Sequence, residues 1–152
     1  MELFIEHGAW YTELYFLLKV LSALIAGGAI GWERESAGKE AGIRTFGFIC
    51  AGACCYSVIS LLVAADSASR IIANVVVGIG FIAGGVIYRA HGVDNVSHGL
   101  TTASSLWVTA TIGIMIGIEM YILAVGVTIL TLLTLHLPSS KLWIYLSKKH
   151  LN

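Results

Sequence analysis

Charged residues are scarce in this 152-residue sequence. Only 12% of the residues are Asp, Glu, Lys or Arg, whereas 57% are hydrophobic, and the mean hydropathy is +0.86. A soluble domain carries about a quarter charged residues, because its surface faces water. The shortage of charge therefore excludes a soluble globule and makes lipid the expected solvent.

A net charge of either sign is also missing, since nine basic residues balance nine acidic ones. Domains that bind nucleic acid carry a clustered positive charge, so the sequence predicts no nucleic-acid partner. The N-terminus is acidic, with Glu2, Glu6 and Glu13. Because a secretory signal peptide begins with basic residues, we expect no cleavable signal here.

Motifs of enzymatic chemistry are absent from the sequence. It holds no glycine-rich phosphate loop ending in Lys-Ser/Thr, no His-Glu-x-x-His and no Gly-x-Ser-x-Gly. Cys50, Cys54 and Cys55 lie in one apolar run without another soft ligand, which is typical of small residues in a packed helix. The segment from His91 to His98 has two imidazoles and a carboxylate but no recognised metal-ligand spacing. The sequence therefore predicts a protein that is not an enzyme and holds no cofactor or metal.

Five apolar stretches account for most of the chain: residues 14–32, 46–65, 71–88, 103–118 and 121–137. Each approaches the ~20 residues that a helix needs to cross ~30 Å of hydrocarbon. Gly117, Glu119 and Met120 alone interrupt the last two, which predicts a tight hairpin. The predicted fold is all-α: a polytopic, compact bundle of five transmembrane helices over residues 1–138, followed by a short basic interfacial tail over residues 139–152.

The basic residues predict the orientation of these helices. With five crossings, seven of the nine fall on the side of the C-terminus, Arg70 alone falls on the other side, and Lys19 lies within the first stretch. The positive-inside rule then places the N-terminus outside and the C-terminus in the cytoplasm. Lys19 lies about 7 Å below the outer boundary. We expect it to snorkel to the headgroups, the alternative being a pairing with Asp66 or Glu119.

Glycine spacing predicts where the helices touch. Membrane helices associate through close packing and polar contacts, because lipid is as apolar as leucine. Glycine pairs four residues apart share a helix face, and Asn74 adds a polar group to the third stretch. The expected contact residues are Gly27, Gly31, Asn74, Gly80, Phe81, Gly84, Gly113 and Gly117. We expect them to support a homo-oligomer or a contact with another membrane protein within the lipid bilayer.

The richest polar region runs from Glu33 to Arg44 and contains three charges of each sign. It is either a solvated loop that obeys the positive-inside rule or a network of buried ion pairs that fixes helix ends. For the second case, we expect Glu33 and Arg44 to join the helix ends and Arg34 and Glu35 to face a partner.

Four blocks in order, Gly31–Glu35, Ala41–Thr45, Gly78–Gly85 and Gly99–Trp107, resemble the MgtC/SapB family of bacterial inner-membrane proteins. The resemblance implies a five-helix hydrophobic domain and a multi-pass protein of the inner (plasma) membrane. It also implies a functional polar cluster and adds Trp107 to the packing residues. The cluster comprises Glu33, Arg34, Glu35, Arg44, Thr45, Arg89, Thr101 and Thr102. The chain departs from the family by ending in a basic tail, where many members continue into a small cytoplasmic α+β domain.

Two functions follow from the resemblance. The leading one is a non-catalytic membrane modulator, linked to magnesium limitation and ion homeostasis through other membrane proteins. The alternative is a small permease or ion-conducting oligomer for magnesium or another cation, with Thr102 and Asn74 lining a path between protomers. A permease needs a continuous polar track through mid-membrane, whereas a modulator needs polar groups only at the helix ends and on contact faces.

Overall fold

A computed structural model describes residues 9–89 and 99–137, and every regular element within these ranges is an α-helix. The helices are α2 (Ala9–Ser36), α3 (Ile43–Ser60), α4 (Ala65–Arg89), α5 (Leu100–Gly117) and α6 (Tyr121–His136). Each corresponds to one expected stretch, which confirms the all-α prediction for the described ranges. The basic tail and the segment from His91 to His98 lie outside the described residues.

Four helices, α2 to α5, are long and apolar enough to cross a membrane. The fifth, α6, is apolar but has only 16 residues, or about 24 Å at 1.5 Å per residue. The chain is therefore a multi-pass membrane protein. A fifth crossing by α6 stays a prediction.

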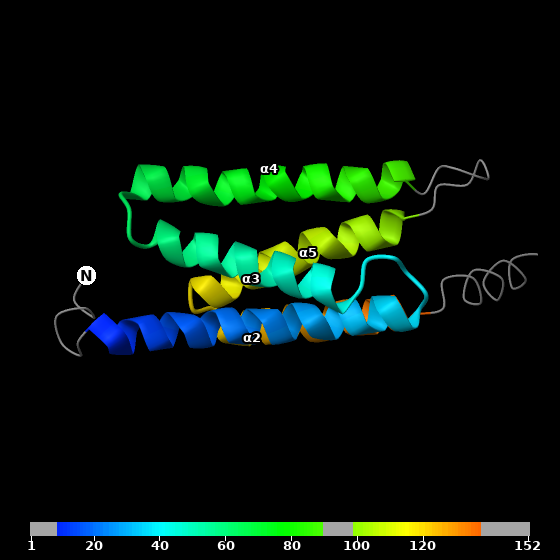
Figure 1. The fold of residues 1–152 in the computed structure, drawn as a ribbon, viewed down its shortest axis with the longest axis horizontal. Helices are drawn as coiled ribbons and strands as arrows, with labels where there is room; N and C mark the ends of the chain where they lie inside the picture. The colour runs from blue at the N-terminus through cyan, green and yellow to red at the C-terminus, as the bar shows by residue number, and fades with distance from the viewer. Residues whose placement is uncertain (1–8, 90–98, 138–152) are drawn as a thin grey trace, which may run out of the picture.

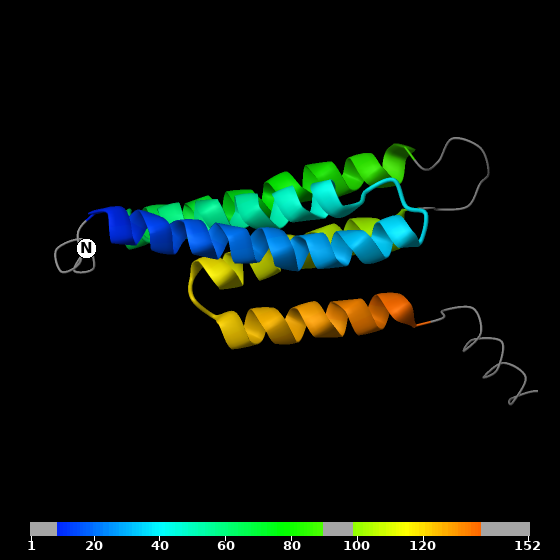
Figure 2. The ribbon, with the colours of Figure 1, turned by 60° about the horizontal axis from the view of Figure 1, so that its bottom comes forward.

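The helices α3 and α5 form the centre of the bundle. On one side α2 packs against both of them, and on the other side α4 does (Figure 1). The short α6 packs on α5 and α2, away from α4 (Figure 2). Because α2 and α4 do not contact each other, the bundle depends on the seam between α3 and α5.

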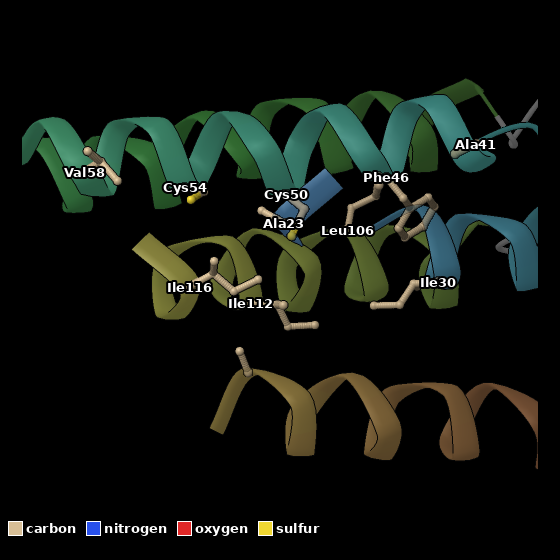
Figure 3. Packing of buried hydrophobic residues seen from close by; sticks show 11 residues of the cluster. Ala23, Ile30, Ala41, Phe46, Cys50, Cys54, Val58, Leu106, Ile112 and Ile116 are labelled. Atoms are coloured by element: carbon tan, nitrogen blue, oxygen red, sulfur yellow. The ribbon is translucent and has the colours of Figure 1, made fainter. Parts of the chain in front are cut away.

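The apolar core fills this seam. Phe46, Cys50 and Cys54 of α3 meet Leu106 of α5 there, and Ile112 extends the core on the side of α5 that faces α6 (Figure 3). All five side chains are fully buried. Cys50 and Cys54 are free thiols that fill small spaces in a packed helix, as predicted, whereas Cys55 is exposed.

Glycines determine how closely the central helices approach. A Cβ atom on Gly117 would lie 2.5 Å from the Cβ of Ser57, and one on Gly113 would overlap the carbonyl oxygen of Cys50. The same holds between α2 and α3, where a Cβ on Gly27 would lie 2.5 Å from the carbonyl oxygen of Phe46. Real side chains do not approach backbone atoms so closely, so these positions need glycine for the observed packing.

One end of the bundle gathers the ends of α2, α4 and α6 and the starts of α3 and α5 (Figures 1 and 2). We call it the basic end, because Arg34, Lys39 and Arg44 belong to it. Towards the opposite end, the hairpin between α5 and α6 stops well short of the α3–α4 connection and of the start of α2 (Figures 1 and 2). The helix α5 has 18 residues, whereas α4 has 25 and α2 has 28.

Candidate functional site

The last turn of α2 holds a nearly buried ion pair. The guanidinium of Arg34, a residue 5% exposed, donates from Nη2 to Oε1 of Glu33 at 2.7 Å, and its Nε donates to Oε2. Two parallel charge-assisted bonds of this kind hold both side chains in one geometry. Part of the polar region is therefore an ion pair against the bundle rather than a solvated loop.

Glu35 connects α2 to the start of α3. Its Oε2 accepts a hydrogen bond of 3.0 Å from the backbone N–H of Ile43, one of the N–H groups that a helix start leaves unpaired. A Cβ on Gly42 would collide with the Glu35 carboxylate, and one on Gly31 would lie 2.6 Å from the Cα of Ile43. Both glycines therefore allow the two helix ends to meet.

Arg44 does not join this pair. It is exposed in the first turn of α3 and forms no ion pair with an acidic residue in the described ranges. The structure differs from the expected division of roles in one pairing: Arg34, not Arg44, neutralises Glu33. Glu35 is exposed and also bonds to the start of α3, so its contact with a partner stays a prediction. Sequence spacing misled because neighbours at i and i+1 do not normally face each other on a helix.

The threonines of the expected cluster separate. Thr45 and Thr102 come together on a pocket of about 480 Å³ at the basic end, whereas Thr101 is exposed. Lys39 and Glu40 also line this pocket, although the sequence analysis did not select them as site residues. Four separate segments meet there, which explains why no sequence motif revealed it. Arg89 ends α4, and the structure does not describe its side chain.

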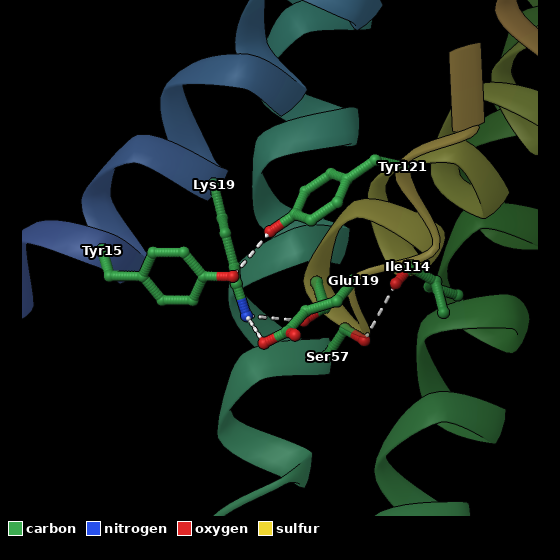
Figure 4. A network of polar contacts seen from close by, with 7 residues as sticks. Tyr15, Lys19, Ser57, Ile114, Glu119 and Tyr121 are labelled. Carbon is green, nitrogen blue, oxygen red and sulfur yellow. Dashed lines mark hydrogen bonds and ion pairs between the residues drawn. The ribbon is translucent and has the colours of Figure 1, made fainter. Parts of the chain in front are cut away.

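Lys19 does not snorkel, contrary to the expectation. It is 2% exposed, and its Nζ forms an ion pair with Oε1 of Glu119 at 2.9 Å while donating to the carbonyl oxygen of Gly117 at 3.2 Å (Figure 4). The rings of Tyr15 and Phe16 lie 4.7 and 5.2 Å from Nζ. Because the α5–α6 hairpin is recessed, it brings the carboxylate to the depth of Lys19, and the alternative pairing is the correct one.

Two tyrosines accompany this pair, and the sequence analysis missed their contact. The hydroxyls of Tyr15 and Tyr121 lie 3.1 Å apart and link α2 to the first residue of α6 (Figure 4). Glu119 itself has a φ of +69°, in the left-handed region that glycine favours. The Lys19–Glu119 and Tyr15–Tyr121 contacts therefore hold the α5–α6 turn, with its left-handed residue, against α2.

The remaining packing candidates lie at exposed positions of α4 and α5. A Cβ on Gly80 or Gly84 would meet no atom within 4 Å, and Phe81 is 87% exposed. Asn74 lies in an open apolar groove between α3 and α4 and forms no hydrogen bond with another described residue. Trp107 on α5 is also exposed. These residues make few contacts within the chain, unlike Gly27, Gly31, Gly113 and Gly117.

Known proteins match most of this chain. The sequence model of the MgtC family matches residues 20–140. The "Putative magnesium transporter YhiD" of Escherichia coli K12 is 42% identical over 130 residues, which cover 79% of this chain and 59% of YhiD. Protein MgtC of Salmonella typhimurium LT2 is 39% identical over 117 residues, which cover 77% of this chain and 49% of MgtC. Protein SrpB of Synechococcus elongatus is 33% identical over 146 residues, which cover 88% of this chain and 78% of SrpB. The chain thus spans less than two thirds of YhiD and of MgtC, and no solved structure matches it.

Proposed function

This chain belongs to the MgtC family, and on that premise we propose that it is a non-catalytic modulator in the bacterial inner membrane. It acts by contacting other membrane proteins or further copies of itself, and it serves the response to magnesium limitation. The magnesium link draws support from the name of YhiD, a relative at 42% identity. Residues 20–140, which match the family, include the described basic end and Glu119, and Lys19 directly precedes them.

The observation that carries this proposal is the apolar centre of the bundle. Between the basic end and the Lys19 pair, the described core side chains at the α3–α5 seam are mainly apolar and fully buried. Thr109 and Ser105 also lie there, but each hydroxyl donates to a carbonyl of its own helix at 2.8 Å. The described part of one chain therefore offers no continuous polar track to an ion.

A second function, an ion-conducting oligomer, is favoured by Asn74 alone. Its side chain lines the open groove between α3 and α4 and has no hydrogen-bond partner among the described residues. Unpaired polar groups are unfavourable in lipid, so a polar path formed between copies would give this amide a suitable environment.

Magnesium flux separates the two functions. Proteoliposomes with a trapped magnesium indicator are expected to show no influx above empty liposomes, because the described core of one chain has no continuous polar track. The same protein, purified from the membrane in native-lipid nanodiscs, is expected to be found with further copies of itself or with a second membrane protein. Saturable influx that Asn74→Leu abolishes and Phe81→Leu retains would instead establish the permease.

Topology gives an independent prediction. In a Cys55→Ser background, a membrane-impermeant maleimide added to intact cells is expected to label Ser67→Cys, in the first turn of α4. It should label Lys39→Cys only after the membrane is opened, since the basic end faces the cytoplasm under the positive-inside rule. Labelling of Lys39→Cys in intact cells would reverse the proposed orientation.

A further inference from the structure

A pocket of about 480 Å³ with a mixed polar and apolar lining opens at the basic end, among the α2–α3 loop, α3, α4 and the start of α5. Lys39, Glu40, Thr45 and Thr102 provide its polar lining, and Ile82 and Val86 of α4 provide an apolar wall. Its size is within the range of ligand-binding pockets, roughly 300–1,000 Å³. The proposed modulator function does not require a ligand in this pocket.

Thr102 is the first reason to infer a ligand. The residue is only 4% exposed and lines the pocket. No hydrogen bond joins its hydroxyl to any residue in the described ranges, whereas the equally buried Thr109 donates to Ser105. Thr102 therefore has an unused donor at the wall of a pocket, and Thr45 lines the same pocket without a hydrogen-bond partner among the described residues.

The start of α5 is the second reason. Gly99 precedes the helix with a φ of +94° and has no side-chain cap. The N–H of Ala103 bonds to the carbonyl of Gly99 at 2.8 Å, which leaves the N–H groups of residues 100–102 at the open end of an 18-residue helix. Such an end attracts anions through its unpaired N–H groups and a partial positive charge of about half an elementary charge.

The charges of the lining favour an anion over a metal ion. Lys39 adds a cation, and Glu40 is the single carboxylate among the described lining residues. A magnesium ion needs an octahedral set of oxygens, and the described residues contain no cluster of three His, Cys, Asp or Glu side chains. The helix start would also repel a cation.

We propose that this pocket binds a phosphate-bearing ligand. The phosphate sits at the start of α5, where the Thr102 hydroxyl and the backbone N–H groups donate to it and Lys39 balances its charge. The attached organic part lies against Ile82 and Val86. A phospholipid headgroup and a soluble phosphorylated compound share this chemistry. The inference goes beyond the proposed function, since neither magnesium flux nor assembly depends on it.

Melting of the full chain, delipidated in detergent, tests the proposal, because a ligand that binds the folded state raises its stability. The probes are inorganic phosphate, with potassium chloride at equal ionic strength as its control, and phosphatidylglycerol, with diacylglycerol as its control. We expect saturable stabilisation by at least one probe and by neither control. Thr102→Val and Lys39→Gln should each weaken apparent affinity about tenfold.

Thr109→Val is the matched control. It removes a hydroxyl equally buried on the same helix but outside the pocket lining, so apparent affinity should stay at the wild-type value. Stabilisation by phosphate identifies a soluble ligand, and stabilisation by phosphatidylglycerol that phosphate does not compete away identifies a lipid headgroup. The proposal is overturned if neither probe stabilises the chain, or if Thr102→Val and Thr109→Val behave alike. Stabilisation by magnesium chloride that Glu40→Gln weakens would overturn it as well, in favour of a cation site.

Discussion

Gly113→Ala is expected to destabilise the bundle by about 3 kcal/mol, at the upper end of the usual range for overpacking a core. A methyl group at this position overlaps the carbonyl oxygen of Cys50 and lies 3.0 Å from the Cβ of Ala53. The obstacle is backbone, which cannot turn aside as a flexible side chain can. The α3–α5 seam must therefore open, and the contacts of α2 and α4 weaken with it, because both helices pack against α3 and α5.

The matched control is Gly80→Ala on α4. A methyl group there meets no atom within 4 Å, so only the conformational freedom of the chain changes, and alanine is favoured over glycine in a helix by about 0.5–1 kcal/mol. Thermal unfolding in detergent and the amount of protein in the membrane measure both effects. The melting temperature should fall steeply for Gly113→Ala and stay level or rise for Gly80→Ala. Equal melting temperatures would show that the α3–α5 packing described above is wrong.

These two glycines also show how far the sequence predicts the fold. Apolar runs locate all five helices, since a helix in lipid must satisfy its backbone internally. Spacing marks Gly113 and Gly80 alike as contact positions, but only the folded chain shows that α3 lies against the first and that no described residue covers the second. Which residues surround a given glycine depends on the tertiary structure, and the spacing of residues along one helix does not predict it.

Helix ends were harder to predict than helices. The first helix was expected to stop at Trp32, yet α2 continues to Ser36. Its extra turn contains two glutamates and an arginine, which are good helix formers, and the Glu33–Arg34 bond neutralises two of them. The helix stops where Gly38 takes a φ of +71°. Hydropathy predicts only the apolar part of a helix. The last turn of α2 is charged, so hydropathy did not include it.

The sequence selects the charged residues of the candidate site but not the contacts that they make. The sequence shows which charges lie near the first helix end, while side-chain conformation decides that Arg34 is buried and Arg44 is exposed. The pocket with Thr45 and Thr102 needs four segments to meet. No local pattern encodes such a meeting, although the family resemblance had already selected both threonines.

The depth of the α5–α6 turn makes the Lys19 pair a second test of the structure. Breaking a buried ion pair by removing one partner typically destabilises a protein by 3–5 kcal/mol, because the other charge is left unpaired. The two partners here differ in their surroundings: the Lys19 side chain is 1% exposed and that of Glu119 is 49% exposed. Removing Glu119 and removing Lys19 should therefore lower the free energy of unfolding by different amounts.

Glu119→Gln is expected to destabilise the chain by about 3 kcal/mol, since the buried ammonium keeps only an amide, the Gly117 carbonyl and two ring faces. Lys19→Met should cost about 1 kcal/mol or less, because Glu119 can be solvated and methionine fills the apolar space. The double variant should be about as stable as Lys19→Met alone. Without Lys19 there is no buried ammonium that Glu119→Gln could leave unpaired. Thermal unfolding of the four proteins in one detergent measures this cycle. Equal losses from the two single variants, or simple additivity in the double variant, would mean that Lys19 reaches water after all and that the hairpin is not recessed to its depth.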